Sequence, residues 1–201
     1  MLANWRGWGS FPRVFDTRIA HTTAETDARA AIAAADERWP GYWTIAAETT
    51  LNAHYTGRHL VDEVWRFLRS VGVEDTHTAW EPGCGTGTWM TAREAIPRME
   101  GVEFDPATAA IARWMLTDSQ HVHGGRIEDW QLDRSQLAGG VGYDLVVGNV
   151  PFAAYTPVAD DNPGHNLHNY AILKAANLTR PGGYIAVITS RYTLDAADTR
   201  F

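Results

Sequence analysis

The stretch Glu81-Pro82-Gly83-Cys84-Gly85-Thr86-Gly87, EPGCGTG in one-letter code, decides the fold. It joins an apolar run to a segment of helical propensity at about residues 88–95. Its three glycines, at every second position, let the backbone turn sharply and come close to a ligand. The spacing differs from the GxGxxG of dinucleotide sites and the GxxxxGKT of phosphate-binding loops. The loop therefore predicts a ligand site of another kind, with a purely structural strand-to-helix turn as the alternative.

From Val73 onward, short apolar runs alternate with segments expected to be helical, at about residues 88–95, 106–117 and 166–178. This alternation is typical of a parallel sheet that is covered by helices on both faces. We therefore predict an α/β fold with a Rossmann-like, doubly wound, mostly parallel sheet. The predicted strands lie in the runs HTAWEPG, RMEGVEFD, QHVHGGRIED, YDLVVGNVPF and GGYIAVITS.

The opening third of the chain reads differently. It is irregular and rich in tryptophan up to about Trp43, with an alanine-rich helical segment from Thr23 to Arg38. A second helix is expected after TLNAHYT (residues 50–56), because Leu60, Val64, Phe67 and Leu68 recur at helical spacing. We expect residues 1–58 to form an aromatic and helical N-terminal extension and residues 59–201 to form the core.

Composition limits the function classes. The chain has 201 residues, 45% hydrophobic and 20% charged, which fits a globular domain. Cys84 is the only cysteine, so a disulfide framework or a thiolate zinc cage within one chain is excluded. The eight histidines show no catalytic zinc pattern, and no metal is expected. There is no signal-peptide or membrane-span pattern, so we expect a cytoplasmic protein without a membrane partner.

Two acidic residues, one at the glycine loop and one at the end of the next predicted strand, are candidate ligand-binding residues. Glu81 opens the loop, and Glu103 ends the next predicted strand about 20 residues on, where an acid can accept hydrogen bonds from both ribose hydroxyls of a nucleoside. Asp105 is the alternative ribose ligand, but it could instead cap a helix that begins at Pro106.

These features resemble class I S-adenosylmethionine-dependent methyltransferases. The resemblance implies that S-adenosylmethionine is the cofactor, that Gly83, Cys84, Gly85 and Gly87 form its loop, and that Glu81 serves its charged methionyl end. In RIEDW (residues 126–130) the resemblance places the adenine: Asp129 would accept from the exocyclic amine, and Trp130 or Ile127 would cover one face. A helix-capping aspartate followed by a buried tryptophan is the structural alternative. Cys84 is expected to be a small packing residue rather than a nucleophile.

The tetrapeptide Asn149-Val150-Pro151-Phe152 follows the fourth apolar run. It resembles the NPPY or NPPF motif of amino-methyltransferases that act on adenine and, in a smaller group, on glutamine. The Asn149 side-chain oxygen and the Val150 carbonyl can accept the two hydrogens of an amine. Pro151 stiffens the turn, and Phe152 offers a ring on which a flipped base can stack. Valine replaces the usual proline at 150, which leaves the backbone freer.

TLNAHYT occupies the place of the segment that closes over the methionyl carboxylate in many such enzymes. Tyr55 and Thr56 would bind the cofactor, making the extension a cofactor lid. Gly57 replaces the usual proline of that segment. The alternative is that Thr56 caps the following helix.

Over its whole length the sequence resembles the N-terminal methyltransferase region of the large methyltransferase-helicase antirestriction proteins of phages and conjugative elements, the DarB-like type. The resemblance implies an adenine-specific DNA methyltransferase with DNA as substrate. The family continues beyond the point where this sequence stops, at Phe201, so we expect a truncated core that lacks the terminal strand pair. A missing C-terminal region, a partner chain or the aromatic N-terminus would then complete the sheet. Methylation of protein glutamine or of RNA adenine, or a non-catalytic cofactor-binding subunit, are the alternatives.

Overall fold

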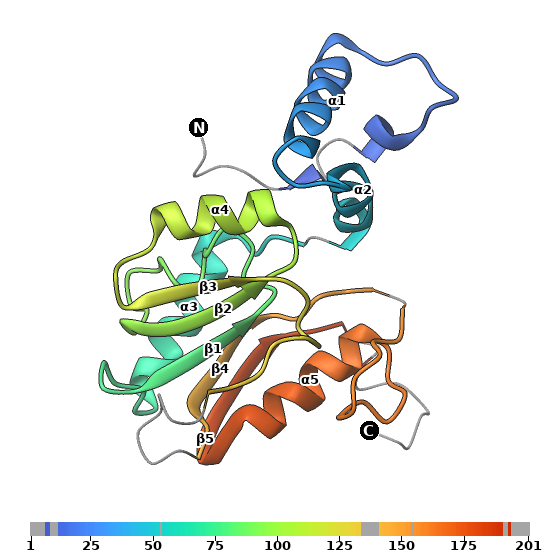
Figure 1. Ribbon diagram of the computed structural model, residues 1–201. Coiled ribbons are helices and arrows are strands. Elements are labelled where there is room, and N and C mark those ends of the chain that lie inside the picture. The colour runs from blue at the N-terminus through green and yellow to red at the C-terminus, as the bar shows by residue number, and fades with distance from the viewer. Residues whose placement is uncertain are drawn as a thin grey trace.

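A five-stranded, all-parallel sheet organises the molecule (Figure 1). The computed structural model describes residues 7–8, 12–52, 54–133, 141–153, 155–190 and 193. The strand order is β3-β2-β1-β4-β5. This confirms the predicted α/β, doubly wound architecture, because the order runs outward in both directions from a central β1. The strands are β1 (Thr78–Pro82), β2 (Arg98–Glu103), β3 (Gln120–Gly124), β4 (Tyr143–Asn149) and β5 (Thr179–Ile188).

Helices cover both faces of the sheet. Helices α3 (Arg58–Ser70) and α4 (Pro106–Met115) share one core with Ala79, Met99 and Leu145 of the strands. Helix α5 (Leu167–Leu178) shares the opposite core with Trp80 and Val146. Because neighbouring residues of a strand point to opposite faces, β1 and β4 supply both cores. Both central strands are therefore buried along most of their length.

The buried face of α3 differs from the predicted one. Val61, Trp65 and Leu68 point into the core, whereas Leu60 and Phe67 are 44% and 64% exposed. Of the predicted apolar stripe, Leu68 is buried and Val64 packs against the core, so the prediction was wrong for Leu60 and Phe67 only. The larger surface of Trp65 decides the orientation, and its indole N–H donates to the carbonyl of Trp89 at 3.0 Å.

The helix predicted at about residues 88–95 is absent; the chain forms a series of turns there. Several of its carbonyl oxygens accept side-chain donors from α3 and β3 instead of continuing a backbone ladder. Such donors compete with helix formation because each carbonyl finds its partner outside the segment. The pairs are Trp65 to Trp89, Gln120 to Met90, Arg58 to Thr91, and Arg69 to Glu94 and Ala95.

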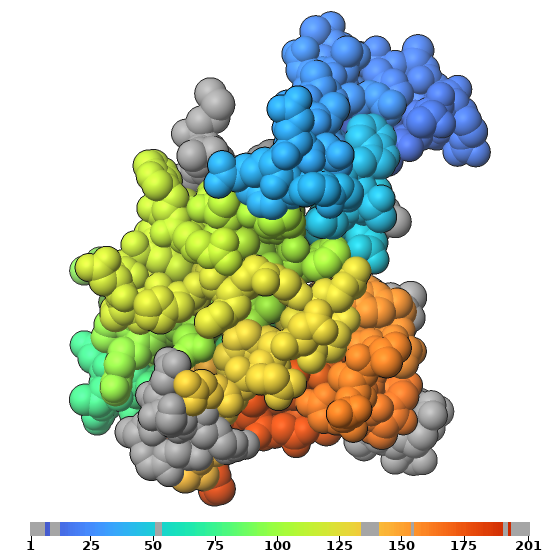
Figure 2. Space-filling view, in the orientation of Figure 1, coloured from blue at the N-terminus to red at the C-terminus, as the bar shows by residue number. Residues whose placement is uncertain are grey.

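The extension is a separate layer above the sheet and forms a projecting lobe in Figure 2. It contains the 3-10 helix η3 (Pro12–Phe15), α1 (Thr23–Asp36) and α2 (Tyr42–Asn52). Thr22 and Glu25 form a reciprocal capping box at the start of α1. The core of the lobe consists of Trp8, Val14, Ala28, Ile32, Tyr42 and Ala46, with Ala107 of α4 packed against it. The division at residues 58 and 59 stays a prediction.

Strand β5 borders the sheet within the described residues, where it pairs with β4. The suggestion that the aromatic N-terminus covers this edge was wrong for the described part of the extension, which packs against α4. The expectations about Phe201 lie outside the described residues. No helix found in the described part of the chain has the length and apolar character needed to span a membrane.

Candidate functional site

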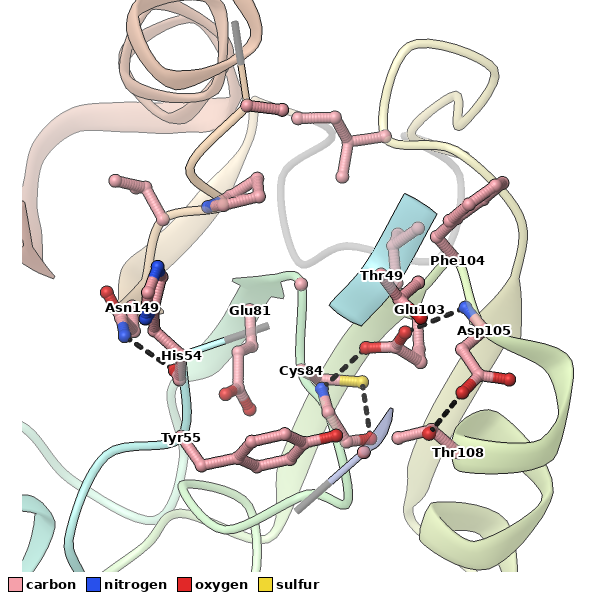
Figure 3. Close-up of a pocket in the computed structure, with 18 of the residues that line it drawn as sticks. Thr49, His54, Tyr55, Glu81, Cys84, Glu103, Phe104, Asp105, Thr108 and Asn149 are labelled. Carbon is pink, nitrogen blue, oxygen red and sulfur yellow. Dashed lines mark hydrogen bonds between the residues drawn. The ribbon is translucent and has the colours of Figure 1, made fainter. Parts of the chain in front are cut away.

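A cavity opens at the carboxyl ends of β1, β2 and β4, beside the point where the strand order reverses (Figure 3). Ligands of open α/β sheets bind at such switch points. The cavity holds about 1080 Å³ of space, part of which opens to solvent. The sheet supplies its floor, and the extension supplies residues from α2 and from the segment 54–56. Its lining includes Glu48, Thr49, His54, Tyr55, Thr56, Glu81, Gly83, Cys84, Gly85, Glu103, Phe104, Arg126, Ile127, Asn149, Val150 and Pro151.

The glycine loop forms one wall of the cavity. Gly83, Gly85 and Gly87 all have positive φ angles, of 67°, 56° and 75°, a backbone region that favours glycine. A Cβ atom on Gly85 would lie 3.0 Å from the ring of Tyr55, so the loop and the segment 54–56 are in close contact. Gly87 instead faces Leu116 behind the wall and is not among the lining residues. Cys84 lines the cavity, and burial raises the pKa of its thiol, which fits a packing role.

Glu81 lies at the centre of the cavity floor and is 1% exposed. Its Oε2 atom has no hydrogen-bond partner in the described structure. Burial raises the pKa of Glu81 well above its ordinary value, and the nearby carboxylate of Glu103 raises it further. A buried carboxylate without a partner is costly, and a cationic ligand would relieve that cost. The environment of Glu81 therefore suits a positively charged group.

Glu103 is held by the backbone on two sides. Its Oε2 accepts from the N–H of Gly85 and its Oε1 from the N–H of Asp105, both at 2.8 Å. Burial raises the pKa of Glu103 to about 7, although these N–H donors act in the opposite direction. Asp105 accepts from the N–H of Ala107 and caps α4, which begins at Pro106. Both acids line the cavity, but Glu103 is the preset acceptor, whereas the Asp105 side chain caps α4.

The end of the cavity beyond Glu103 differs from the sequence-based expectation. Asp129 is exposed, and Trp130 is buried in the core, stacked on Trp80 at 5.3 Å between ring centroids. Neither residue lines the cavity, whereas Ile127, the predicted alternative to Trp130, does. Stacking of Trp130 on both Trp80 and Tyr143 in the core accounts for its position.

Phe104 and Arg126 line that end of the cavity together with Ile127. The Arg126 guanidinium lies 4.2 Å from the ring centroid of Phe104. It also pairs with Glu48 of α2 at 3.1 Å and donates to the Tyr155 hydroxyl at 3.2 Å. Arg126 therefore connects the extension, the loop after β3 and the loop after β4 at the rim of the cavity.

Asn149 ends β4 at the opposite end of the cavity. Its Nδ2 donates to the backbone carbonyl of His54 at 2.8 Å, while its Oδ1 is buried and has no partner in the described structure. Because a carbonyl oxygen can only accept, this bond fixes which end of the amide carries the nitrogen. A hydrogen-bond acceptor is therefore left free at the cavity wall.

Comparisons with solved structures agree with this geometry. A methyltransferase subunit of a type I restriction-modification system from Streptococcus thermophilus aligns with a TM-score of 0.56 and 16% identity, over 90% of this chain and 47% of that one. A proposed RNA methyltransferase from Pyrococcus horikoshii aligns with a TM-score of 0.52 and 14% identity, over 71% of this chain and 66% of that one. The chain has the class I methyltransferase fold.

The chain spans about half to two thirds of the length of these structures. No protein-family model and no curated protein matches it. The likeness is therefore one of fold at low sequence identity. Within this methyltransferase fold, the cavity lies where the glycine loop, the acid at the end of β2 and the end of β4 converge.

The remaining predicted residues fall on both sides of the cavity wall. Tyr55 and Thr56 line it, and the N-cap of α3 is Gly57, so the alternative that Thr56 caps this helix was wrong. Phe152 does not line it: its ring is tilted against His168 at 4.7 Å between centroids and meets His54 at 5.2 Å. An acceptor that stacks on Phe152 would have to replace one of these rings.

Several lining residues were not predicted from the sequence, among them Glu48, Thr49, His54, Phe104 and Arg126. His54 lies inside TLNAHYT, next to the predicted Tyr55 and Thr56, and Arg126 opens RIEDW, next to the predicted Ile127, so both motifs marked the right segments. No sequence motif pointed to Glu48, because it lines the cavity only through the way α2 is placed against the sheet.

Proposed function

We propose that this chain binds S-adenosylmethionine in the cavity and transfers its methyl group to the exocyclic amine of adenine in DNA. The cofactor supplies an electrophilic methyl group on a sulfonium centre. Three features of the cavity fit it. They are the Glu81 carboxylate, whose Oε2 has no partner and suits the methionyl ammonium, the glycine loop, and the preset carboxylate of Glu103 for the ribose hydroxyls. Phe104, Arg126 and Ile127 would surround the adenine.

The free Oδ1 of Asn149 is the single observation that carries the transfer step. An aromatic amine is a weak nucleophile because its lone pair is delocalised into the ring. Asn149 Oδ1 and the carbonyl of Val150 would accept its two hydrogens, which favours a more tetrahedral nitrogen whose lone pair points into the cavity. The amine nitrogen would bond to the methyl carbon as the sulfur–methyl bond breaks, S-adenosylhomocysteine would leave, and the proton lost by the nitrogen would pass to water. This direct displacement depends on positioning and needs no covalent enzyme intermediate.

The choice of DNA adenine follows the resemblance of the NVPF tetrapeptide and its flanking motifs to amino-methyltransferases. The aligned Streptococcus thermophilus protein, a restriction-modification methyltransferase subunit, is compatible with that choice. Phe152 would offer its ring to the flipped base once the ring of His54 moves away. Protection of mobile-element DNA against restriction is the biological setting that we propose.

Transfer of a labelled methyl group from the cofactor to unmethylated genomic DNA tests the proposal, with RNA and a protein extract as parallel acceptors. We expect label in DNA at N6 of adenine and none with Asn149→Ala, while calorimetry shows that this variant binds S-adenosylhomocysteine within a few fold of the wild-type protein. Label in RNA or protein alone would contradict the DNA assignment. Cofactor binding without any transfer would favour the non-catalytic subunit.

A further inference from the structure

A buried chain of hydrogen bonds connects the extension to the turn that follows β2. The hydroxyl of Tyr42, the first residue of α2, donates to Oδ1 of Asp105 at 2.9 Å. The indole N–H of Trp8 donates to the Tyr42 hydroxyl, also at 2.9 Å. Tyr42 is fully buried, and Trp8 and Asp105 are 7% and 2% exposed. Low exposure makes these bonds stronger than surface bonds and their loss more costly.

The direction of each bond in this chain is fixed. The Trp8 indole can only donate, so it takes a lone pair of the Tyr42 oxygen. The single hydroxyl hydrogen of Tyr42 then goes to the Asp105 carboxylate. Trp8 thus orients the hydroxyl, and Tyr42 delivers its hydrogen to one oxygen of Asp105.

Asp105 is at the same time bound to the cavity. Its backbone N–H donates to Oε1 of Glu103 at 2.8 Å, so the orientation of the turn sets one of the two anchors of that carboxylate. Its side chain accepts from the N–H of Ala107 at 3.0 Å and from the hydroxyl of Thr108 at 2.8 Å. Thr108 in turn bonds the hydroxyl of Tyr55, which lines the cavity.

Capping of α4 does not require the tyrosine. The local donors Ala107 and Thr108 already satisfy an N-cap aspartate, as they would in any isolated helix. A phenylalanine at position 42 would fill the same volume without burying a hydroxyl. The extra bond, between residues 63 positions apart, acts instead on where the turn lies relative to the sheet.

We infer that Tyr42, oriented by Trp8, is a positioning residue that holds Glu103 through Asp105 in the geometry that binds the ribose hydroxyls of the cofactor. This inference rests on the proposed cofactor binding. The extension then does more than cover the cavity, because its helix α2 sets the acceptor geometry of a carboxylate on the sheet.

A ribose-selective binding experiment tests the inference. We would titrate the wild-type protein and Tyr42→Phe with S-adenosylhomocysteine and with its 2′,3′-dideoxyribose analogue. Loss of one hydrogen bond corresponds to about a twofold to tenfold change in affinity. We expect Tyr42→Phe to weaken the binding of S-adenosylhomocysteine by about that factor. Binding of the analogue should stay unchanged, because the analogue lacks the hydroxyls that Glu103 binds.

Tyr170→Phe is the matched control. Tyr170 is also fully buried and donates to an aspartate, Asp161, but it lies away from the cavity. We expect both ligands to bind this variant as they bind the wild-type protein. Trp8→Phe is a second test of the chain: it should weaken S-adenosylhomocysteine less than Tyr42→Phe does, with the same dependence on the ribose hydroxyls.

The outcomes separate the inference from the function on which it rests. If the wild-type protein does not bind S-adenosylhomocysteine, the cofactor assignment fails and the inference fails with it. If the wild-type protein binds, but Tyr42→Phe weakens both ligands equally, Tyr42 has a general structural role and the inference is wrong. Unchanged binding of both ligands to Tyr42→Phe and Trp8→Phe overturns it as well.

Discussion

Glu81 keeps a carboxylate in the interior at a cost to stability, since its Oε2 has no partner and its side chain is buried. Such residues often exchange stability for function. We predict that Glu81→Gln weakens binding of S-adenosylhomocysteine about tenfold to hundredfold, the range of a lost charge-assisted hydrogen bond. The free energy of unfolding of the ligand-free protein should stay level or rise. Calorimetry and urea unfolding measure the two effects.

Glu128→Gln is the control for this prediction, because Glu128 also has a buried Oε2 without a partner but does not line the cavity. It should bind the ligand within twofold of the wild-type protein. Equal loss of affinity in both variants would remove Glu81 from the proposed ammonium site.

Glu103 predicts a pH dependence of nucleoside binding. Burial and the charge of Asp105 raise its pKa to about 7, so the folded protein holds this proton where the unfolded chain has released it. The contribution of Glu103 to the free energy of unfolding of the ligand-free protein is therefore greatest at low pH. It falls as the pH rises from the ordinary glutamate pKa to about 7. The affinity for a nucleoside that needs the ionised Glu103 carboxylate instead increases with pH, over the range from pH 6 to pH 8.

The measurement uses 5′-methylthioadenosine, which lacks the amino acid and so avoids titration of Glu81 against an ammonium group. If the ionised form alone binds, affinity should increase about tenfold between pH 6 and pH 8, from the ionised fraction at each pH. Glu103→Gln should bind weakly and show no such increase. A flat profile for the wild-type protein would show that the carboxylate of Glu103 does not govern ribose binding.

At the scale of elements, the sequence predicted the strands better than the helices. Apolar runs bounded by glycine and proline located all five strands, most clearly β1 and β4, whose burial on both faces leaves little choice of residue. The turns at 88–95 were missed because their carbonyls depend on donors from α3 and β3, which are distant in sequence. The buried face of α3 was predicted only in part for a related reason: several faces of that helix carry apolar residues, and the sheet selects one.

The same distinction holds for the candidate site. Glu81, Gly85, Glu103 and Asn149 were predicted at the cavity because each lies at or just after the carboxyl end of a strand, and these ends meet at one edge of the sheet. Trp130 was misplaced because an aromatic residue after a strand can serve the core as well as a ligand. Glu48 and Arg126 could not be paired from the sequence, since 78 positions separate them.

The glycine loop packs closely against Gly101 of β2, which leaves no space for a side chain at that position. A Cβ atom there would lie 2.7 Å from Cβ and 2.8 Å from Sγ of Cys84, closer than packed atoms approach. We predict that Gly101→Ala destabilises the protein by about 1–3 kcal/mol, as overpacking does. It should also weaken the binding of S-adenosylhomocysteine, because the new methyl group displaces the loop. Urea unfolding and calorimetry measure these losses.

The double variant Cys84→Gly/Gly101→Ala tests the cause. Removal of the Cys84 side chain opens the space that the new methyl group needs, so the double variant should lose less stability than the sum of the two single variants. If the losses of stability in the two single variants simply add in the double variant, the methyl group at position 101 does not clash with the Cys84 side chain.

At the scale of the whole molecule, the cavity joins the extension and the sheet, because α2, the segment 54–56 and the ends of β1, β2 and β4 all line it. A ligand that contacts all of them should stabilise both layers together. We predict that S-adenosylhomocysteine at about 100 times its Kd raises the free energy of unfolding by about 2.7 kcal/mol. Hydrogen exchange should slow in α2 as well as in the glycine loop and at the end of β4. Protection confined to the sheet, with α2 exchanging at its ligand-free rate, would mean that the extension takes no part in holding the cofactor, and the contacts of Glu48 and Tyr42 would then serve the architecture alone.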